Sequence, residues 1–378
     1  MNLALTAAIL TLLSGGASSG FRIAATLLAI HLKSPPLVVG LLLAAYSLLS
    51  ALLSIWIGRF VDRAGPKRPI LINLGVIAGG LLLALLWPVL PVLFVVMLLL
   101  GCASNAMAIT LSNAVGMASR PEERARNFTI YTSGISASNA VGPALVGFAI
   151  DGFGFQGGFL LPLTFVAAAF ALFWSRRSVF PAARPKPAAE KHAAFSLLLD
   201  RNLWPVLIAS CVVSAIWDAF QFIAPVWGTQ IGLSASAIGV LVSAFAVATF
   251  TVRVVLPMLS RRFREWTLIT ASITVAGLAF AAIPLAGAVG SLTAAAIVLG
   301  ATFGFGLPMV LSIAFEASPK GREAEVTGLR FALSAAVHVT VPIVMGAVSG
   351  VFGLGAVAVG VAVVMFGGAW SLRGRGGR

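Results

Sequence analysis

Residues 37–68 read LVVGLLLAAYSLLSALLSIWIGRFVDRAGPKR, an apolar run that ends in a cluster of cations. A helix that crosses the hydrocarbon core of a bilayer needs about 20 mostly apolar residues. Lys and Arg gather in the short connections on the cytoplasmic side of such helices. The stretch therefore predicts a membrane-spanning helix over 37–57, followed by a short cytoplasmic connection.

The composition of all 378 residues agrees with this interpretation, because 60% are apolar and only 10% are charged. Soluble domains carry about 45–50% apolar and about 25% charged residues. These values exclude a cytosolic enzyme, a secreted scaffold and a disordered chain. The net charge of +14 is spread over short connections instead of one basic stripe, so we expect no nucleic-acid partner. Cys102 and Cys211 lie in apolar runs, so we expect packing there and no metal site.

Apolar runs long enough to span a membrane recur along the chain. We place twelve of them, at 3–32, 37–57, 69–88, 92–116, 127–150, 157–174, 203–230, 236–257, 267–286, 290–315, 325–349 and 353–372. The long polar stretch 175–202 predicts a solvated linker. We therefore expect an all-α membrane protein with an N-terminal six-helix bundle (1–174), a linker (175–202) and a C-terminal six-helix bundle (203–378).

The cations set the orientation. They follow spans two, four, six, eight and ten and form the C-terminal tail, all on one side, while Lys33 alone lies in a connection on the other side. The positive-inside rule then places both termini and the linker in the cytoplasm. We expect the membrane to be a bacterial-type inner membrane.

The two halves match each other without a gap at a shift of 199 positions. Phe21 falls on Phe220, Gly40 on Gly239, and both fifth spans carry P-x-x-x-G. Parallel repeats of this kind are typical of transporters that work by alternating access, with the substrate site near the midplane between the repeats.

A motif follows the second span, Gly58-Arg-Phe-Val-Asp62-Arg63-Ala-Gly65-Pro-Lys67-Arg68. It resembles the G-x-x-x-D-R-x-G-R/K-R/K signature of the major facilitator superfamily, with Pro66 displacing the first basic residue. The resemblance covers the whole chain. It implies a gate in which Asp62 docks against the start of span eleven, near Thr327 and Arg330. We expect Gly58 and Gly65 to allow a close helix approach and a tight turn. The expected gating residues are Gly58, Asp62, Arg63, Gly65, Arg253 and Arg330. The last two lie within one or two turns of the cytoplasmic helix ends, which favours a gating or interfacial position over contact with the substrate.

The fifth span carries Ser138-Asn-Ala-Val-Gly142-Pro143-Ala-Leu-Val-Gly147. This is similar to the G-x-x-x-G-P-x-x-G-G motif of proton-coupled exporters of that family, with Ser138 and Phe148 in place of two glycines. The resemblance favours export, whereas a kinked, closely packed helix would explain the same residues. The expected helix-packing residues are Gly142, Pro143, Gly147, Pro342 and Gly346.

Ionisable side chains at membrane depth are costly, so they mark function or a partner. Asp218 lies near the centre of its span, on a polar stripe with Ser214 and Gln221. We expect Asp218 to be the proton-coupling residue. His338 is a candidate proton relay, with a hydrogen-bonded packing residue as the alternative. Arg22 is the counter-charge of Asp218, an anchor for an anionic solute, or the partner of Asp218 in a static pair that only holds the halves together. The expected substrate cavity contains Arg22, Trp217, Gln221, Phe222, Asn105, Asn113, Ser138 and Asn139.

The sequence thus predicts a monomeric, proton-coupled secondary transporter of a small organic solute, with efflux favoured and membrane lipid around it. We expect no enzymatic activity, cofactor or metal, and a proton gradient as the driving force. Two alternatives stay open. One is uptake or exchange of a small organic anion, and the other is a membrane receptor or scramblase that does not transport.

Overall fold

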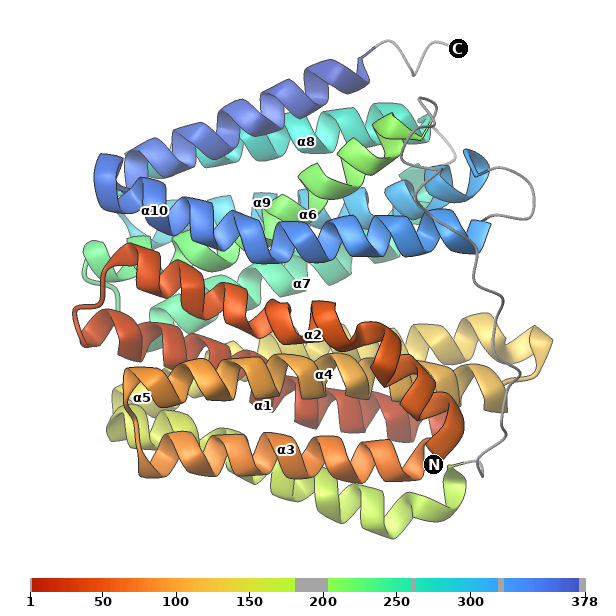
Figure 1. Cartoon of the computed structure of the whole chain (residues 1–378). Coiled ribbons are helices and arrows are strands. Elements are labelled where there is room, and N and C mark those ends of the chain that lie inside the picture. The colour runs from red at the N-terminus through yellow and green to blue at the C-terminus, as the bar shows by residue number, and fades with distance from the viewer. Residues whose placement is uncertain (1, 181–202, 260–262, 319–322, 374–378) are drawn as a thin grey trace. The chain divides into compact units, whose positions relative to one another are not determined.

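The computed structural model describes residues 2–180, 203–259, 263–318 and 323–373. In these ranges the chain is helical and contains no strand. Ten of its helices are long and apolar enough to cross a membrane. They are α1 (Leu3–His31), α2 (Pro36–Ala64), α3 (Lys67–Leu86), α4 (Leu90–Ala118), α5 (Arg124–Arg176), α6 (Trp204–Gln230), α7 (Ala235–Leu259), α8 (Glu265–Ala282), α9 (Val289–Glu316) and α10 (Glu323–Leu372), as Figure 1 shows.

Two of these helices, α5 and α10, each join two helical arms across a kink. The kinks lie at Gly154, with φ 68°, and at Gly353, with φ 80°. This backbone region is open to glycine without a steric cost and ends a right-handed helix. In the described part of the chain there are therefore ten long helices, where we expected twelve separate ones. The expected fifth and sixth spans correspond to the two arms of α5, and the last two spans to the arms of α10.

The motif after the second span lies mostly on helices, with Gly58–Ala64 in α2 and Lys67–Arg68 in α3, and not in a loop as we expected. Helix α2 continues to Ala64, and the turn is made at Gly65, with φ 67°, just before α3 starts at Lys67. The expectation of a tight turn at Gly65 is met. The close approach expected at Gly58 stays a prediction, because no described atom lies within 4 Å of a Cβ added there. The described part of the linker comprises the end of α5 and a short 3₁₀ helix, η2 (Arg177–Val179); residues 181–202 lie outside the described ranges.

The chain divides into two compact units. Unit 1 comprises Met1–Ser34, Leu42–Ala188 and Leu233–Ser243, and unit 2 comprises Pro35–Leu41, Ala189–Gly232 and Ala244–Arg378. The first turns of α2 thus cluster with unit 2, and the first turns of α7 cluster with unit 1. Each unit is built around tightly packed helix pairs, α1 with α5 in unit 1 and α6 with α10 in unit 2.

Both units use a glycine at equivalent positions to bring two helix backbones together. In unit 1, a Cβ on Gly101 of α4 would collide with the backbone of Tyr46 in α2. In unit 2, a Cβ on Gly300 of α9 would collide with the backbone of Phe245 in α7. The two pairs are related by the shift of 199 positions. Small residues at such crossings allow the close packing that drives helix association in lipid. The repeat seen in the sequence is therefore also a repeat of packing.

Candidate functional site

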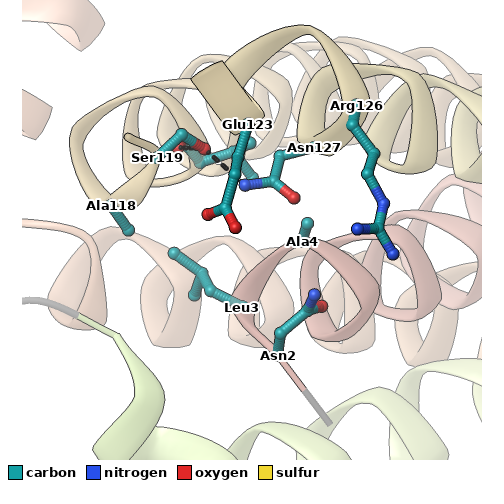
Figure 2. Close-up of a pocket in the computed structure, with 9 residues that line it drawn as sticks. Asn2, Leu3, Ala4, Ala118, Ser119, Glu123, Arg126 and Asn127 are labelled. Atoms are coloured by element: carbon teal, nitrogen blue, oxygen red, sulfur yellow. Dashed lines mark hydrogen bonds between the residues drawn. The ribbon is translucent and has the colours of Figure 1, made fainter. Parts of the chain in front are cut away.

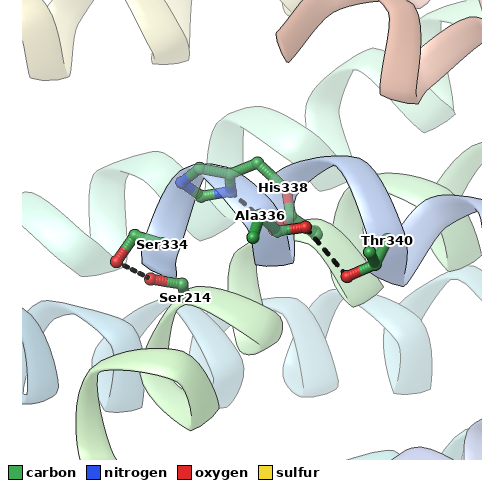
Figure 3. A network of polar contacts seen from close by, with 6 residues as sticks. Ser214, Ser334, Ala336, His338 and Thr340 are labelled. Atoms are coloured by element: carbon green, nitrogen blue, oxygen red, sulfur yellow. Dashed lines mark hydrogen bonds and ion pairs between the residues drawn. The ribbon is translucent and has the colours of Figure 1, made fainter. Parts of the chain in front are cut away.

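Polar side chains connect α6 and the first arm of α10 within unit 2 (Figure 3). His338 Nδ1 lies 2.6 Å from Asp218 Oδ2. One turn earlier, the Ser214 hydroxyl donates to Ser334 Oγ at 3.1 Å. The partners differ by 120 positions in both pairs, so the two helices run side by side in the same direction at these levels. We call these residues, together with Ser210 and Arg330 one turn further back, the polar ladder.

The Asp218–His338 pair is shielded from solvent but is not sealed. The Asp218 side chain is 10% exposed and the His338 side chain 34% exposed. A contact of 2.6 Å between a ring nitrogen and a carboxylate oxygen is in the range of a charge-assisted hydrogen bond. Such a pair can hold a proton and pass it to whichever group gains access to the more exposed imidazole.

The equivalent place in unit 1 carries groups that do not titrate. The shift of 199 positions relates Ser19 to Asp218 and Asn139 to His338. Ser19 Oγ donates to the backbone oxygen of Ser138 at 2.9 Å, and therefore also joins the two helices of its pair, α1 and α5. Ser138 is buried and Asn139 half-buried. The repeat thus keeps a polar link at this level in each unit, and only unit 2 makes it from acid and base.

The expected cavity residues of unit 2 divide into polar and packed ones. Gln221 is 4% exposed, and its Oε1 has no hydrogen-bond partner. Trp217 packs against Phe245 and Phe303, with ring centroids 5.4 and 5.5 Å apart. Phe222 is fully buried. The Oε1 of Gln221 can therefore accept a hydrogen bond from a ligand or water. Trp217 and Phe222 instead pack within the unit, and Phe222 does not line an accessible surface.

The expected cavity residues of unit 1 lie on α1, α4 and α5. Arg22 is half-buried, with its guanidinium carbon 5.4 Å from the centre of the Tyr46 ring. Asn105 and Asn113 on α4 are also half-buried. Arg22 belongs to unit 1 and Asp218 to unit 2, so their pairing stays a prediction.

The expected gate is described only in part. Arg63 is exposed, and the side chains of Asp62 and Thr327 lie outside what the structure describes, so the docking of Asp62 stays a prediction. Arg253 is half-buried and Arg330 only 2% exposed, and the Nε of each has no hydrogen-bond partner. Arg330 therefore does not extend to an aqueous surface, which was one expectation for it.

The P-x-x-x-G residues make close backbone contacts. Within unit 1, Gly147 lies against the backbone of Ala235, and Pro143 lies against Gly239. Gly142 lies against the backbone of α1. The equivalent contacts of unit 2 use Gly346 against Pro36 and Pro342 against Gly40.

Asp151 was not singled out from the sequence. It lies at the end of the first arm of α5, where its Oδ1 and Oδ2 accept hydrogen bonds from the backbone N–H groups of Ala235 and Ser236 at 3.0 and 2.9 Å. These are orphan donors of the first turn of α7, so Asp151 caps that helix from another one. All three residues belong to unit 1. A lone acid between two spans was the only signal available in the sequence.

Two hollows lie away from the polar ladder. A polar cavity of about 170 Å³ lies between the start of α1, the end of α4 and the start of α5, with Glu123, Arg126 and Asn127 around it (Figure 2). An apolar groove of about 320 Å³ lies between α6 and the two arms of α10. No charged side chain lines the groove, so its surface suits lipid chains better than a polar solute.

Comparisons with known proteins give a consistent result. The family model described as Major Facilitator Superfamily matches residues 7–342. No curated protein sequence matches the chain. The fold is similar to that of a POT family transporter in complex with 5-aminolevulinic acid (14% identity, TM-score 0.81, covering 97% of this chain and 94% of the other). It is also similar to the nucleoside transporter NupG (16%, 0.78, 98% and 98%). A third similar structure is a bacterial homolog of the human lysosomal transporter Spinster (14%, 0.79, 98% and 95%).

These neighbours share the fold at low identity, and the family model covers most of the chain. Ten long apolar helices agree with a multi-pass membrane protein, and the family match supports solute transport. The chain belongs to the Major Facilitator Superfamily.

Proposed function

We propose that this chain is a proton-coupled secondary transporter and that the Asp218–His338 pair carries the coupled proton. The observation that supports this most directly is the 2.6 Å contact between an acid and a base on two neighbouring helices. The sequence pointed to both residues separately, and the structure joins them.

The net charge of the Asp218–His338 pair depends on whether it holds a proton. With one proton beyond the carboxylate and the neutral imidazole, the pair is neutral overall. Without that proton it carries one negative charge at a largely buried position. A buried charge without a partner is unfavourable, so proton release favours a conformation in which water or solute reaches the pair. Protonation and deprotonation of the pair therefore favour different conformations. This difference in free energy couples the proton to alternating access.

Direction and location form part of the same proposal. The fifth-span motif favours efflux, and the basic connections favour both termini in the cytoplasm. The membrane of this proposal is a bacterial-type inner membrane. The solute is a small organic molecule. The chain acts as a monomer, because each six-helix half supplies one side of the expected site.

The test separates proton coupling from solute movement. A thermal-shift screen on the purified protein first finds a stabilising solute, since ligands that bind the folded state raise apparent stability by mass action. In proteoliposomes, an imposed pH gradient then accelerates transport of that solute by the wild type. We expect Asp218→Asn to abolish this acceleration and to retain solute exchange at equal pH.

The matched control is Glu122→Gln, which neutralises an exposed acid outside the polar ladder. We expect its pH-driven transport to equal that of the wild type. His338→Gln should weaken the response to the gradient. Full gradient-driven transport by Asp218→Asn would refute the proposal.

A further inference from the structure

The polar ladder ends in two buried polar groups without hydrogen-bond partners. Ser210 and Arg330 are each 2% exposed. Ser210 Oγ and Arg330 Nε make no hydrogen bond. Polar atoms that are buried in a folded protein are nearly always paired, so each orphan calls for water, an ion or a ligand. Here two orphans occur on the two helices of one pair.

The register of the ladder places these two groups at the same level. Ser214 pairs with Ser334 and Asp218 with His338, both at an offset of 120. The same offset relates Ser210 to Arg330. Four residues of helix rise by about 6 Å, so this level lies about 6 Å from the serine pair and about 12 Å from the Asp218–His338 pair.

The unpaired groups of Ser210 and Arg330 are both hydrogen-bond donors, and one of them is positively charged, so together they suit an anion. Arg330 supplies a guanidinium whose described surroundings contain an aromatic face, with its central carbon 4.4 Å from the Phe331 ring centre, and no paired carboxylate. The Nε–H edge of a guanidinium binds a carboxylate through two parallel hydrogen bonds. A serine hydroxyl beside it can donate a third.

We propose that Ser210 and Arg330 form a subsite for the carboxylate group of the transported solute. The inference rests on the proposed transport function and names its substrate class. It also favours the organic-anion alternative over a cationic drug, because the subsite supplies a positive charge that no described acid neutralises. The solute extends from this level along the ladder towards Ser214, Ser334 and the Asp218–His338 pair.

The test uses the full-length protein in detergent, with benzoate and acetate as carboxylate probes and benzamide as the uncharged analogue of benzoate. We expect the wild-type melting temperature to rise saturably with both carboxylates and to stay constant with benzamide. Arg330→Gln should lose the rise. Arg330→Lys keeps the charge but lacks the planar fork, so the probes should bind it at least tenfold more weakly. Ser210→Ala should weaken binding several-fold.

The control variant is Arg177→Gln, which removes a cation that also lies over an aromatic ring, 4.5 Å from Trp174, but is exposed. Its response to benzoate should equal that of the wild type. An unchanged response in Arg330→Gln would overturn the subsite. So would the absence of any response in the wild type to either carboxylate up to about 100 mM, which is about 100-fold above a dissociation constant of about 1 mM. Asp218→Asn separates the two proposals. Loss of proton coupling there with retained benzoate binding supports both, whereas retained coupling refutes only the proton role.

Discussion

Replacement of Asp151 tests whether its cap holds the start of α7 in place. Asp151 accepts hydrogen bonds from the backbone N–H groups of Ala235 and Ser236. Loss of a capping side chain costs about 0.5–2 kcal/mol. Both bonds have a charged acceptor, but Asp151 is exposed, and solvent screens its charge. We therefore expect Asp151→Ala to destabilise the first turn of α7 by about 1–2 kcal/mol, and Asp151→Asn by about half of that, because one acceptor oxygen remains.

Hydrogen–deuterium exchange measures this locally. An opening free energy lower by about 1–2 kcal/mol corresponds to exchange roughly five- to thirtyfold faster. The increase should be confined to peptides that cover residues 233–243. Glu122→Ala, which removes an exposed acid elsewhere, should leave these peptides unchanged. Equal deuterium uptake over 233–243 in Asp151→Ala and the wild type would refute the capping role.

The cap also predicts a pH dependence. Partial burial raises the pKa of Asp151, but hydrogen bonds from Ser236, Ser234 and Ala235 together lower it below the ordinary value of 3.8. A carboxyl group with a lowered folded-state pKa stabilises the fold above its unfolded-state pKa and loses this contribution as pH falls through the folded-state pKa. The stability difference between the wild type and Asp151→Ala should therefore be constant above about pH 4 and shrink below it. A difference that grows as the pH falls would contradict this sign.

Three further predictions concern packing. Gly300→Leu should strongly reduce the yield of folded protein in size-exclusion chromatography, because the added side chain would meet the backbone of Phe245. The control Gly290→Leu has no described atom near its added Cβ and should give the wild-type yield. Ser19→Ala removes the hydrogen bond to the Ser138 backbone. It should lower the free energy of unfolding, measured with denaturant, by about 0.6 kcal/mol and at most roughly 1.7 kcal/mol. Tyr131→Phe removes the hydrogen bond that the Tyr131 hydroxyl donates to the Ala108 backbone and should lower the free energy of unfolding by a similar amount. An unchanged free energy of unfolding in both variants would contradict these two predictions.

Hydrophobicity and the internal repeat made most of the fold predictable from the sequence. Helix α6 starts at Trp204 and ends at Gln230, against an expected 203–230. The extension of α2 to Ala64 was missed because its last turns are polar and charged, and span length alone cannot show that a helix continues into water. The kinks at Gly154 and Gly353 depend on a backbone angle that a glycine permits but does not require.

The candidate site was predictable by residue but not by contact. Period and charge singled out Asp218 and His338 separately, whereas their pairing depends on how α6 packs against α10. Sequence position placed Arg330 near a helix end, where a long side chain can extend to water, and only the fold shows that it is buried. Asp151 was missed because its partners are backbone N–H groups of a helix 84 and 85 positions away, and backbone groups leave no trace in a sequence.

The division into units affects how this protein could be cut in two. Residues 35–41 cluster with unit 2 and residues 233–243 with unit 1, so neither unit is a continuous half of the chain. Two polypeptides made by splitting the gene at its middle would each lack a piece of one folded unit and would carry a piece of the other. Split reporters and fragment complementation should therefore depend on joint synthesis of both fragments. The internal repeat alone would instead suggest that each half could fold by itself.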